Sequence, residues 1–331
     1  MRVSGIDVSH KTVMVAIRKD EKTRKPRQFD NRAEGHLSVL KALQSAKVTR
    51  VCLEATGTYH LDLALTLCDG GLEVMVVNPK AAKRFAEAML SRTKTDAVDA
   101  VLLAEFAVRM PFEPWPRPDE QALALRACAR RISALGQART AAKNQLHAAR
   151  QTTSTPAFLI DDLELSISQL DTQIQTLRQH AIRLIGADKH LQGTFDLLIT
   201  IKGIATASAI QIMGELLVLP ADMRAKQWVA MAGLDPRAYE SGTSVLKKPR
   251  LSKAGNRYLR IALFMPALSA SLHDPNVKTF YRHLIDTRGL KKIQAICAVM
   301  RKLLLAIHAM LKARTPFDSS RFYQSPEATA P

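Results

Sequence analysis

Arg2-Val-Ser-Gly-Ile-Asp-Val8 decides the fold, because an apolar strand pattern here reaches an acid just where the strand should end. A second apolar run, at residues 12–18, follows the short turn Ser9-His-Lys11 and completes a pair of successive strands. The run Arg50-Val-Cys-Leu-Glu54 has the same form, since an apolar strand again ends in an acid. Acids are rarely buried without a partner, so Asp7 and Glu54 are candidates for chemistry.

Residues 1–110 predict an α/β domain. Besides the first two strands, the pattern predicts strands at 24–29, 48–54 and 72–77 and helices at 33–46, 60–68 and 81–89. Early hairpins followed by alternating strands and helices imply a mixed sheet with helices packed against it.

The rest of the chain predicts helices. Residues 111–118 contain four prolines and form a linker. Apolar residues at three- and four-residue spacing predict two long helices within 119–187, joined near Thr152–Pro156. Heptad spacing of this length favours a coiled-coil hairpin that joins subunits into a dimer or tetramer, although two helices packed on their own domain fit the same pattern. Residues 190–310 predict a helical domain, and 311–331 a C-terminal tail.

The composition indicates a globular protein with a polyanionic partner. Apolar residues make up 47% of the chain, and 48 Lys and Arg against 30 acids give a formal net charge of +18. Nucleic acid is the first expected partner and a membrane surface the second. No run approaches the ~20 uncharged apolar residues of a spanning helix, and the chain enters a strand at once, so no membrane segment or signal peptide is expected. The four scattered cysteines argue against zinc and disulfides, and a reducing cytoplasm is the expected location.

A further acid pair, Asp96 and Asp99, is separated by one helical turn. If Thr95 caps a helix, both acids lie on one face of it. Adjacent strands can bring Asp7 and Glu54 to neighbouring positions. Four carboxylates from two strands and a helix predict a Mg²⁺ site that works on phosphate, because Mg²⁺ prefers carboxylate oxygens together with substrate phosphates.

Each acid also has a purely structural interpretation. Asp7 fits a turn, and Glu54 fits an ion pair with a nearby Lys or Arg. Asp96 and Asp99 fit a solvated first helical turn, where acids suit the helix dipole. The metal site is favoured because all four occur together, in the order strand, strand, helix.

Four strings carry a resemblance to a known family, and they read Gly5-Ile-Asp-Val-Ser, Glu54-Ala-Thr-Gly-Thr-Tyr, Val77-Asn-Pro and Lys94-Thr-Asp-Ala-Val-Asp-Ala. They resemble the N-terminal domain of the DEDD transposases of bacterial insertion sequences, the insertion sequence one-hundred-ten family. The order of the acids is also similar to the RNase H-like fold, in its RuvC-type resolvase branch. The resemblance implies that all four acids form the catalytic, metal-binding tetrad of an RNase H-like domain.

The C-terminal half is similar to the transposase domain of the same family, through Gly233-Leu-Asp-Pro236, Glu240-Ser-Gly242 and Lys253-Ala-Gly-Asn256. This resemblance implies that Ser241 joins DNA covalently. From the residues alone, a serine before glycine is a turn or cap residue, and Ser244 is a nearby alternative. The family further implies donor and target double-stranded DNA, and a structured non-coding guide RNA encoded by the element.

Two long stretches without any acid, 121–160 and 241–273, predict a nucleic-acid surface, although a run of charge can simply be a solvated face. Between them, residues 198–209 resemble a helix-hairpin-helix, for which a plain packing corner is the alternative. The candidate contacts from these segments are Arg126, Arg130, Arg131, Lys143, Lys202, Lys247, Lys248, Arg250, Lys253, Asn256 and Arg257.

These observations together predict a metal-dependent DNA transposase and recombinase that acts through a phosphoserine at Ser241. The alternative is a RuvC-like junction-resolving nuclease that activates water at the carboxylates, with Ser241 structural. A non-catalytic nucleic-acid-binding protein is the third interpretation.

Overall fold

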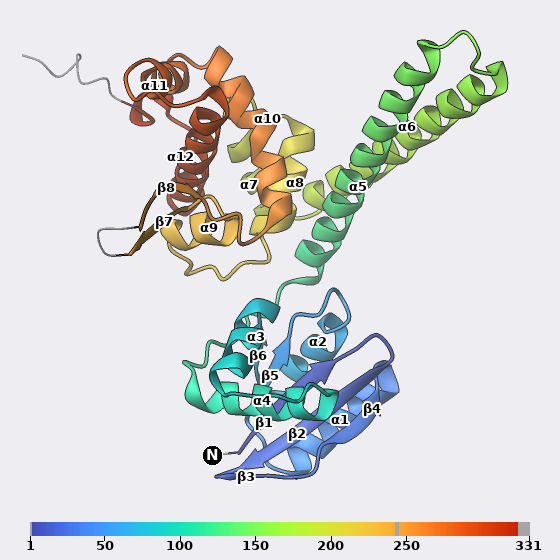
Figure 1. Cartoon of the computed structure of the whole chain (residues 1–331), viewed down its shortest axis with the longest axis vertical. Coiled ribbons are helices and arrows are strands. Elements are labelled where there is room, and N and C mark those ends of the chain that lie inside the picture. The colour runs from blue at the N-terminus through green and yellow to red at the C-terminus, as the bar shows by residue number, and fades with distance from the viewer. Residues whose placement is uncertain (1, 242–244, 324–331) are drawn as a thin grey trace, which may run out of the picture. The chain divides into compact units, whose positions relative to one another are not determined.

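The computed structural model describes the backbone of residues 2–241 and 245–323, with side chains except at 239–248. The chain divides into two compact units, Met1–Arg117 and Pro118–Pro331 (Figure 1). Each unit is described by itself.

A mixed sheet forms the centre of the N-terminal unit. Its strands are β1 (Arg2–Val8), β2 (Thr12–Lys19), β3 (Lys22–Thr23), β4 (Arg27–Asp30), β5 (Arg50–Glu54) and β6 (Glu73–Val77). They follow the order β3-β2-β1-β5-β6, and β4 also pairs with β2. Strand β1 is antiparallel to β2 but parallel to β5, which is parallel to β6. The carboxyl ends of β1 and β5 therefore meet at one edge of the sheet.

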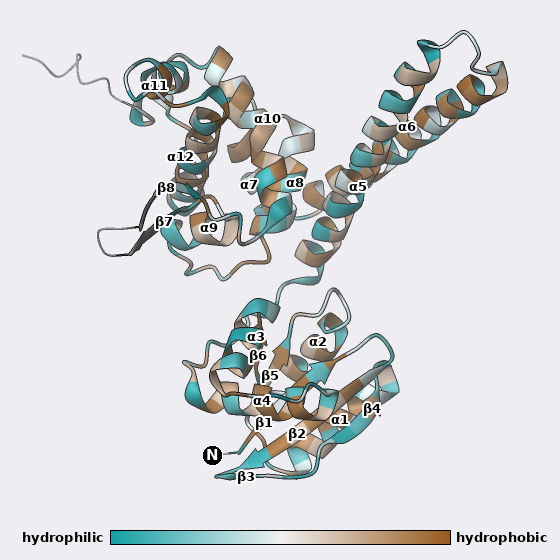
Figure 2. Ribbon diagram, viewed as in Figure 1, coloured by the Kyte–Doolittle hydropathy of each residue, from teal (hydrophilic) through white to brown (hydrophobic). Residues whose placement is uncertain are grey.

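Helices cover both faces of this sheet, and they are α1 (Ala33–Ser45), α2 (Leu61–Asp69), α3 (Pro79–Ala88) and α4 (Asp96–Arg109). Side chains alternate along the strands, so Ile6 and Leu53 pack with α1 and α2, whereas Val3 and Cys52 pack with α4. The hydrophobic colouring of the central strands in Figure 2 reflects burial on both faces. The structure confirms the predicted α/β class.

The proline-rich segment 111–118 contains no helix or strand. It lies against the N-terminal unit, because the Trp115 amide donates to the Val74 carbonyl at 2.6 Å and the Trp115 ring packs against the sheet core. Arg117 adds an ion pair with Asp69 at 2.5 Å.

The C-terminal unit is mainly helical. Its helices are α5 (Glu120–Arg150), α6 (Ala157–Gly186), α7 (Lys189–Ile199), α8 (Thr206–Leu216), α9 (Ala225–Ala232), α10 (Arg257–His273), α11 (Pro275–Asp286), α12 (Lys292–Ala313) and the short 3₁₀ helix η1 (Ser319–Arg321). Helices α5 and α6 form the predicted hairpin (Figure 1). Its base shares one hydrophobic core with the later helices, since Leu125 and Ile185 pack with Met213 and Leu263. The hairpin and the predicted domain at 190–310 therefore belong to one compact unit.

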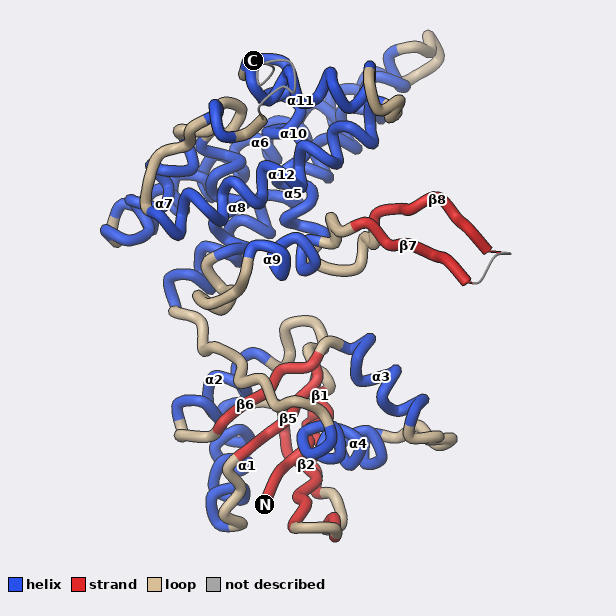
Figure 3. The backbone as a smooth tube through the Cα atoms, turned by 90° about the vertical axis from the view of Figure 1, so that its left-hand side faces the viewer, coloured by secondary structure: helices blue, strands red, loops and turns tan. Residues whose placement is uncertain are grey.

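The prediction of helices throughout 190–310 omitted a β-hairpin, which consists of β7 (Pro236–Ser241) and β8 (Val245–Leu251). Arg237 pairs with Arg250, and Ser241 pairs with Val245. Figure 3 shows both strands extending away from the helices of their unit. The helical prediction failed here because Pro249 and the glycine after Ser241 interrupt any helical period, while a lone two-stranded hairpin has too short a pattern to stand out.

Part of the predicted tail belongs to the helical core. Helix α12 continues to Ala313, and the Phe322 side chain beyond it is only 3% exposed. Among the described helices, α12 alone is long and apolar enough to cross a membrane. Its residues Ile296, Val299 and Leu303 are buried against neighbouring helices, which identifies it as a core helix.

Candidate active site

Strand alternation directs Asp7 and Glu54 to the same face of the sheet. Val3 and Cys52 lie on the face covered by α4, so Asp7, four residues after Val3, and Glu54, two residues after Cys52, lie on that face as well. In the parallel register Ile6 pairs with Leu53. Asp7 and Glu54 each come one residue later, so they lie side by side near the ends of their strands. Both are half-buried.

Helix α4 brings the other two acids. The Thr95 hydroxyl caps the helix by accepting the Val98 amide at 3.3 Å, as predicted, and Asp96 and Asp99 occupy the first turn. The helix can cross β1 closely because residue 5 is glycine. A Cβ at Gly5 would lie 2.1 Å from the Ala100 carbonyl oxygen, so any side chain there would displace α4.

Burial and neighbouring carboxylates raise the pKa of three of these acids, Asp7, Glu54 and Asp99. Burial raises the pKa of Asp7 to about 6, and the charges of Asp96, Asp99 and Glu54 add to this effect, against a backbone hydrogen bond from Val8. Burial and the charge of Asp99 raise the pKa of Glu54, and Lys94 opposes that shift. Burial also raises the pKa of Asp99, again against Lys94.

No ion pair within the described residues involves any of these four acids. Four carboxylates that form no ion pair with a described residue, in a protein of net charge +18, are an unusual concentration of negative charge. Oxygen-only donors of this kind fit a hard cation such as Mg²⁺.

The acids are not gathered into a ready-made metal cluster. In the part of the chain that the structure describes, no three His, Cys, Asp or Glu side chains are close enough to hold a metal ion. The structure thus brings the predicted tetrad to one edge of the sheet without showing metal coordination.

A cavity of about 420 Å³ opens beside Glu54 and Asp99. Phe85 and Phe106 contribute to its apolar lining and meet edge to face, with ring centroids 5.0 Å apart. Its cationic lining residues are Lys83, Arg92 and Lys94. An apolar surface next to cations and carboxylates suits a nucleotide whose phosphate lies at the acids.

Ser241 lies in the C-terminal unit, at the end of β7. Neither unit by itself contains both this serine and the four carboxylates. The Ser241 side chain lies outside the described side chains, as do those of Lys247 and Lys248, and Ser244 lies outside the described residues.

Two of the predicted nucleic-acid contacts instead bind a buried acid. Glu215, only 1% exposed, accepts hydrogen bonds from Arg130 Nε and Nη2 at 2.7 and 2.9 Å. Asn256 Nδ2 donates to the same carboxylate at 2.5 Å, while its Oδ1 caps α10 by accepting the Tyr258 amide. The bond to Glu215 raises the pKa of Arg130 further, and burial lowers that of neighbouring Arg126. These side chains tie α5, α8 and α10 together.

The role of Glu215 was not predicted from the sequence, although its position in an apolar segment indicates one. It is the only acid in the apolar segment Ile210-Gln-Ile-Met-Gly-Glu-Leu-Leu-Val218, where a buried carboxylate requires a cation. Residue Gly214 beside it lets α8 approach α5, because a Cβ there would lie 2.9 Å from Ala129 Cβ.

Arg126 is half-buried. The remaining predicted contacts with described side chains are exposed, and these are Arg131, Lys143, Lys202, Arg250, Lys253 and Arg257. Lys202 lies in the loop between α7 and α8, where Gly203 has a φ of 103° and a Cβ would lie 2.7 Å from the Pro266 carbonyl oxygen. This loop therefore packs closely against α10. Such packing is what we expect if residues 198–209 form a plain packing corner.

Two family models match the chain. A transposase model for the DEDD domain covers residues 4–154, and a model of the transposase IS116/IS110/IS902 family covers residues 195–282. A pilin gene-inverting protein of Moraxella bovis is 31% identical over 308 residues, which span 88% of this chain and 89% of that protein. The chain belongs to the IS116/IS110/IS902 transposase family.

Other comparisons agree with membership in the IS116/IS110/IS902 family. The pilin gene-inverting protein of Moraxella lacunata is 30% identical over 308 residues, or 88% of this chain and 89% of its own length. An uncharacterized 43.6 kDa protein of insertion element IS110 from Streptomyces coelicolor is 33% identical over 88 residues, 27% of this chain and 21% of that protein. As a member of this transposase family, the chain is an enzyme that cuts and recombines DNA.

Among solved structures, the chain is similar to Thermus thermophilus RuvC, alone and in complex with a Holliday junction substrate. The match to the complex is 16% identical, has a TM-score of 0.28 and covers 34% of this chain and 98% of RuvC. The family assignment rests on the family models and the Moraxella relatives.

Proposed function

We propose that this transposase cuts and rejoins donor and target double-stranded DNA through a covalent phosphoserine at Ser241, with Mg²⁺ held by Asp7, Glu54, Asp96 and Asp99. One observation carries the metal part of the proposal. The four carboxylates converge on one edge of the sheet and form no ion pair among the described residues, while burial and the other three charges raise the pKa of Asp7 to about 6. A bound divalent cation would supply the missing charge and stabilise the phosphate during transfer.

The proposed chemistry consists of two exchanges of phosphodiester bonds. The Ser241 oxygen forms a bond to phosphorus, the bond from phosphorus to the leaving strand breaks, and the leaving strand keeps a free hydroxyl. A hydroxyl of the second DNA then attacks the phosphoserine, which releases the serine and restores a phosphodiester. Because each bond broken is replaced by a similar one, rejoining needs no nucleotide cofactor. The Moraxella relatives, named for gene inversion, support recombination of this conservative kind.

The location of Ser241 supports this role. It ends β7, in a hairpin that extends from the helices of its unit (Figure 3). The proposed role requires this serine and the carboxylates to act on the same phosphate.

We further propose that the enzyme assembles as a dimer or tetramer and uses a structured non-coding RNA to select its DNA in the bacterial cytoplasm. The net charge of +18 and the exposed cations support nucleic-acid binding. Near the connected ends of α5 and α6, Phe158 is 74% exposed and Leu165 58% exposed. Exposed apolar side chains at the end of a long hairpin favour association with another subunit.

A trapping assay tests the central claim. The protein is incubated with labelled donor and target DNA, Mg²⁺ and RNA from the region flanking its gene, then denatured. We expect a protein–DNA adduct that is lost in Ser241→Ala and in Asp96→Asn. Cut DNA without an adduct, still formed by Ser241→Ala, would instead identify a water-using, RuvC-like nuclease.

A further inference from the structure

A cavity in the helical core has no role in the proposed strand exchange. It measures about 510 Å³ and lies among α7, α8, α9 and α12. Its interior is mostly apolar, formed by Leu198, Met213, Leu216, Leu217, Leu219 and Leu311. This volume and lining are typical of a pocket for a small organic group.

An aromatic side chain in the lining has an unused donor. Trp228 meets the His308 ring edge to face, with centroids 4.8 Å apart. Its Nε1 atom is buried and makes no hydrogen bond with any described residue. A buried donor without a partner is costly, which marks Trp228 as an incompletely satisfied residue of the lining.

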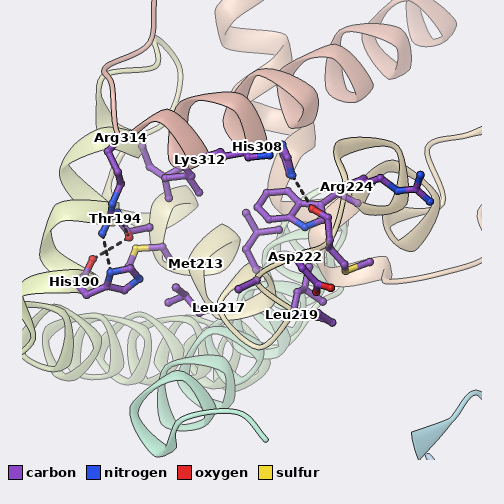
Figure 4. Close-up of a pocket in the computed structure, with 17 residues that line it drawn as sticks. His190, Thr194, Met213, Leu217, Leu219, Asp222, Arg224, His308, Lys312 and Arg314 are labelled. Atoms are coloured by element: carbon purple, nitrogen blue, oxygen red, sulfur yellow. Dashed lines mark hydrogen bonds between the residues drawn. The ribbon is translucent and has the colours of Figure 1, made fainter. Parts of the chain in front are cut away.

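The opposite side of the cavity holds a cation with no acid beside it. Figure 4 shows Arg314, Thr194 and His190 together, away from His308 and Arg224. Arg314 donates from Nη1 to Thr194 Oγ1 at 3.1 Å and from Nη2 to His190 Nδ1 at 2.7 Å. Both acceptors are neutral, so the guanidinium is oriented while its charge stays available to an anion.

The backbone at Arg314 is unfavourable for an arginine. It follows the last turn of α12 with a φ of 54°, in the left-handed region where glycine is the usual residue. A non-glycine residue held in this conformation costs free energy, and such positions concentrate at functional sites. Glycine at this position would relieve the backbone but would lack the guanidinium.

The cationic side chains of this cavity exceed its acids. Arg224, Lys312 and Arg314 line it together with one acid, Asp222. No ion pair among the described residues involves any of these three cations. The cavity thus combines an apolar interior, an aromatic donor and unneutralised cations.

We propose that this cavity binds one nucleotide, with its base against Trp228 and its phosphate at Arg314. A flat heterocycle fits the apolar interior and can pack against the indole ring of Trp228, and a phosphate matches the oriented guanidinium. The nucleotide is either free or a base unstacked from a bound strand, as enzymes that handle nucleic acid often require. The proposal does not rest on the chemistry of Ser241.

Intrinsic fluorescence gives a direct test, because the chain has only two tryptophans. In the full-length Trp115→Phe variant, emission comes from Trp228 alone. The probes are AMP, six-nucleotide adenine strands of RNA and of DNA, and an abasic DNA strand of equal length and charge. Anisotropy of labelled strands reports total binding, and Trp228 emission reports occupancy of the cavity.

We expect saturable quenching by probes that carry bases and none by the abasic strand, even where anisotropy shows that it binds. Quenching by AMP would identify a free nucleotide, and quenching by strands alone an unstacked base. Arg314→Gly, combined with Trp115→Phe, should keep the fold, because glycine tolerates the left-handed backbone at this position. It should nevertheless weaken the affinity measured by quenching about tenfold. Lys292→Gln, at the other end of α12, is the matched control and should leave it unchanged. Equal responses to abasic and base-carrying strands, or no response from Trp228, would overturn the proposal.

Discussion

At the scale of single residues, Asp7 shows how the candidate site opposes stability. Its pKa of about 6 in the fold lies above the ordinary value of 3.8, so the folded chain holds this proton more tightly than the unfolded chain does. Folding free energy is therefore lost as the pH rises from about 4 through 6. The neighbouring carboxylates and burial cause this loss together.

Asp7→Asn should consequently stabilise the protein while abolishing DNA cutting. We expect a gain of about 1 kcal/mol at pH 7.5, reduced by the partial solvent exposure of the site, and no gain near pH 4. Thermal unfolding followed by circular dichroism at both pH values measures the difference. Mg²⁺ should raise the Tm of the natural protein by selective binding to the folded state, and raise it less in the variant. If Asp7→Asn were less stable than the natural protein at pH 7.5, the charge of Asp7 would not destabilise the fold.

Arg130 and Arg131 are neighbours in sequence with contrasting surroundings. Arg130 neutralises the buried Glu215, whereas Arg131 is exposed. Arg130→Ala would leave an unpaired buried carboxylate and should destabilise the protein by about 3 kcal/mol.

Arg131→Ala is the matched control, and it should change stability by less than about 0.5 kcal/mol. If Arg131 contacts phosphate, its loss should weaken DNA binding and lower the salt dependence of the binding constant. Urea denaturation and DNA titrations at several salt concentrations separate the two effects. Equal destabilisation by both substitutions would contradict the structural role of Arg130.

At the scale of elements, the contact between β1 and α4 holds the site together. Gly5→Ala would place a methyl group 2.1 Å from the Ala100 carbonyl oxygen. The helix must shift, and Asp96 and Asp99 shift with it. We expect loss of DNA cutting with the sheet retained, and a destabilisation of about 1–3 kcal/mol.

Gly136→Ala provides the comparison, because nothing lies within 4 Å of a Cβ at that position in α5. Alanine is favoured over glycine inside a helix, so this change should add up to about 1 kcal/mol of stability and keep activity. DNA cleavage assays and thermal unfolding of both variants test the contrast. Full cleavage by Gly5→Ala would show that the packing of α4 does not position the acids.

Elements with a long, regular pattern could be predicted from the sequence, and the others could not. Strands β1 and β5, the Thr95 cap of α4 and the hairpin of α5 and α6 follow directly from apolar periodicity and capping chemistry. Among the described strands, β7 and β8 pair only with each other, and apolar and polar residues alternate along them over too few positions to predict a hairpin. Glu215 was missed because its cation is 85 residues away in sequence, a distance that no local pattern spans.

At the scale of the whole molecule, each unit has its own core. The sheet core and the helical core share no residues, and the division falls at Arg117. We expect residues 1–117 expressed alone to fold, with circular dichroism of a mixed α/β protein and a cooperative thermal transition. The same fragment should bind Mg²⁺ yet form no adduct with DNA, because it lacks Ser241. A fragment without cooperative unfolding would show that the sheet depends on the helical unit.

The cost of these carboxylates to stability also has a consequence for how the sequence changes in inactive copies of the gene. Once a copy of the element no longer moves, selection no longer maintains its catalytic acids. Replacing Asp7 with a neutral residue then increases the folding stability of the protein that this copy still encodes. We therefore expect inactive copies to lose these acids sooner than they lose Gly5, which the packing of the sheet requires whether or not the enzyme works.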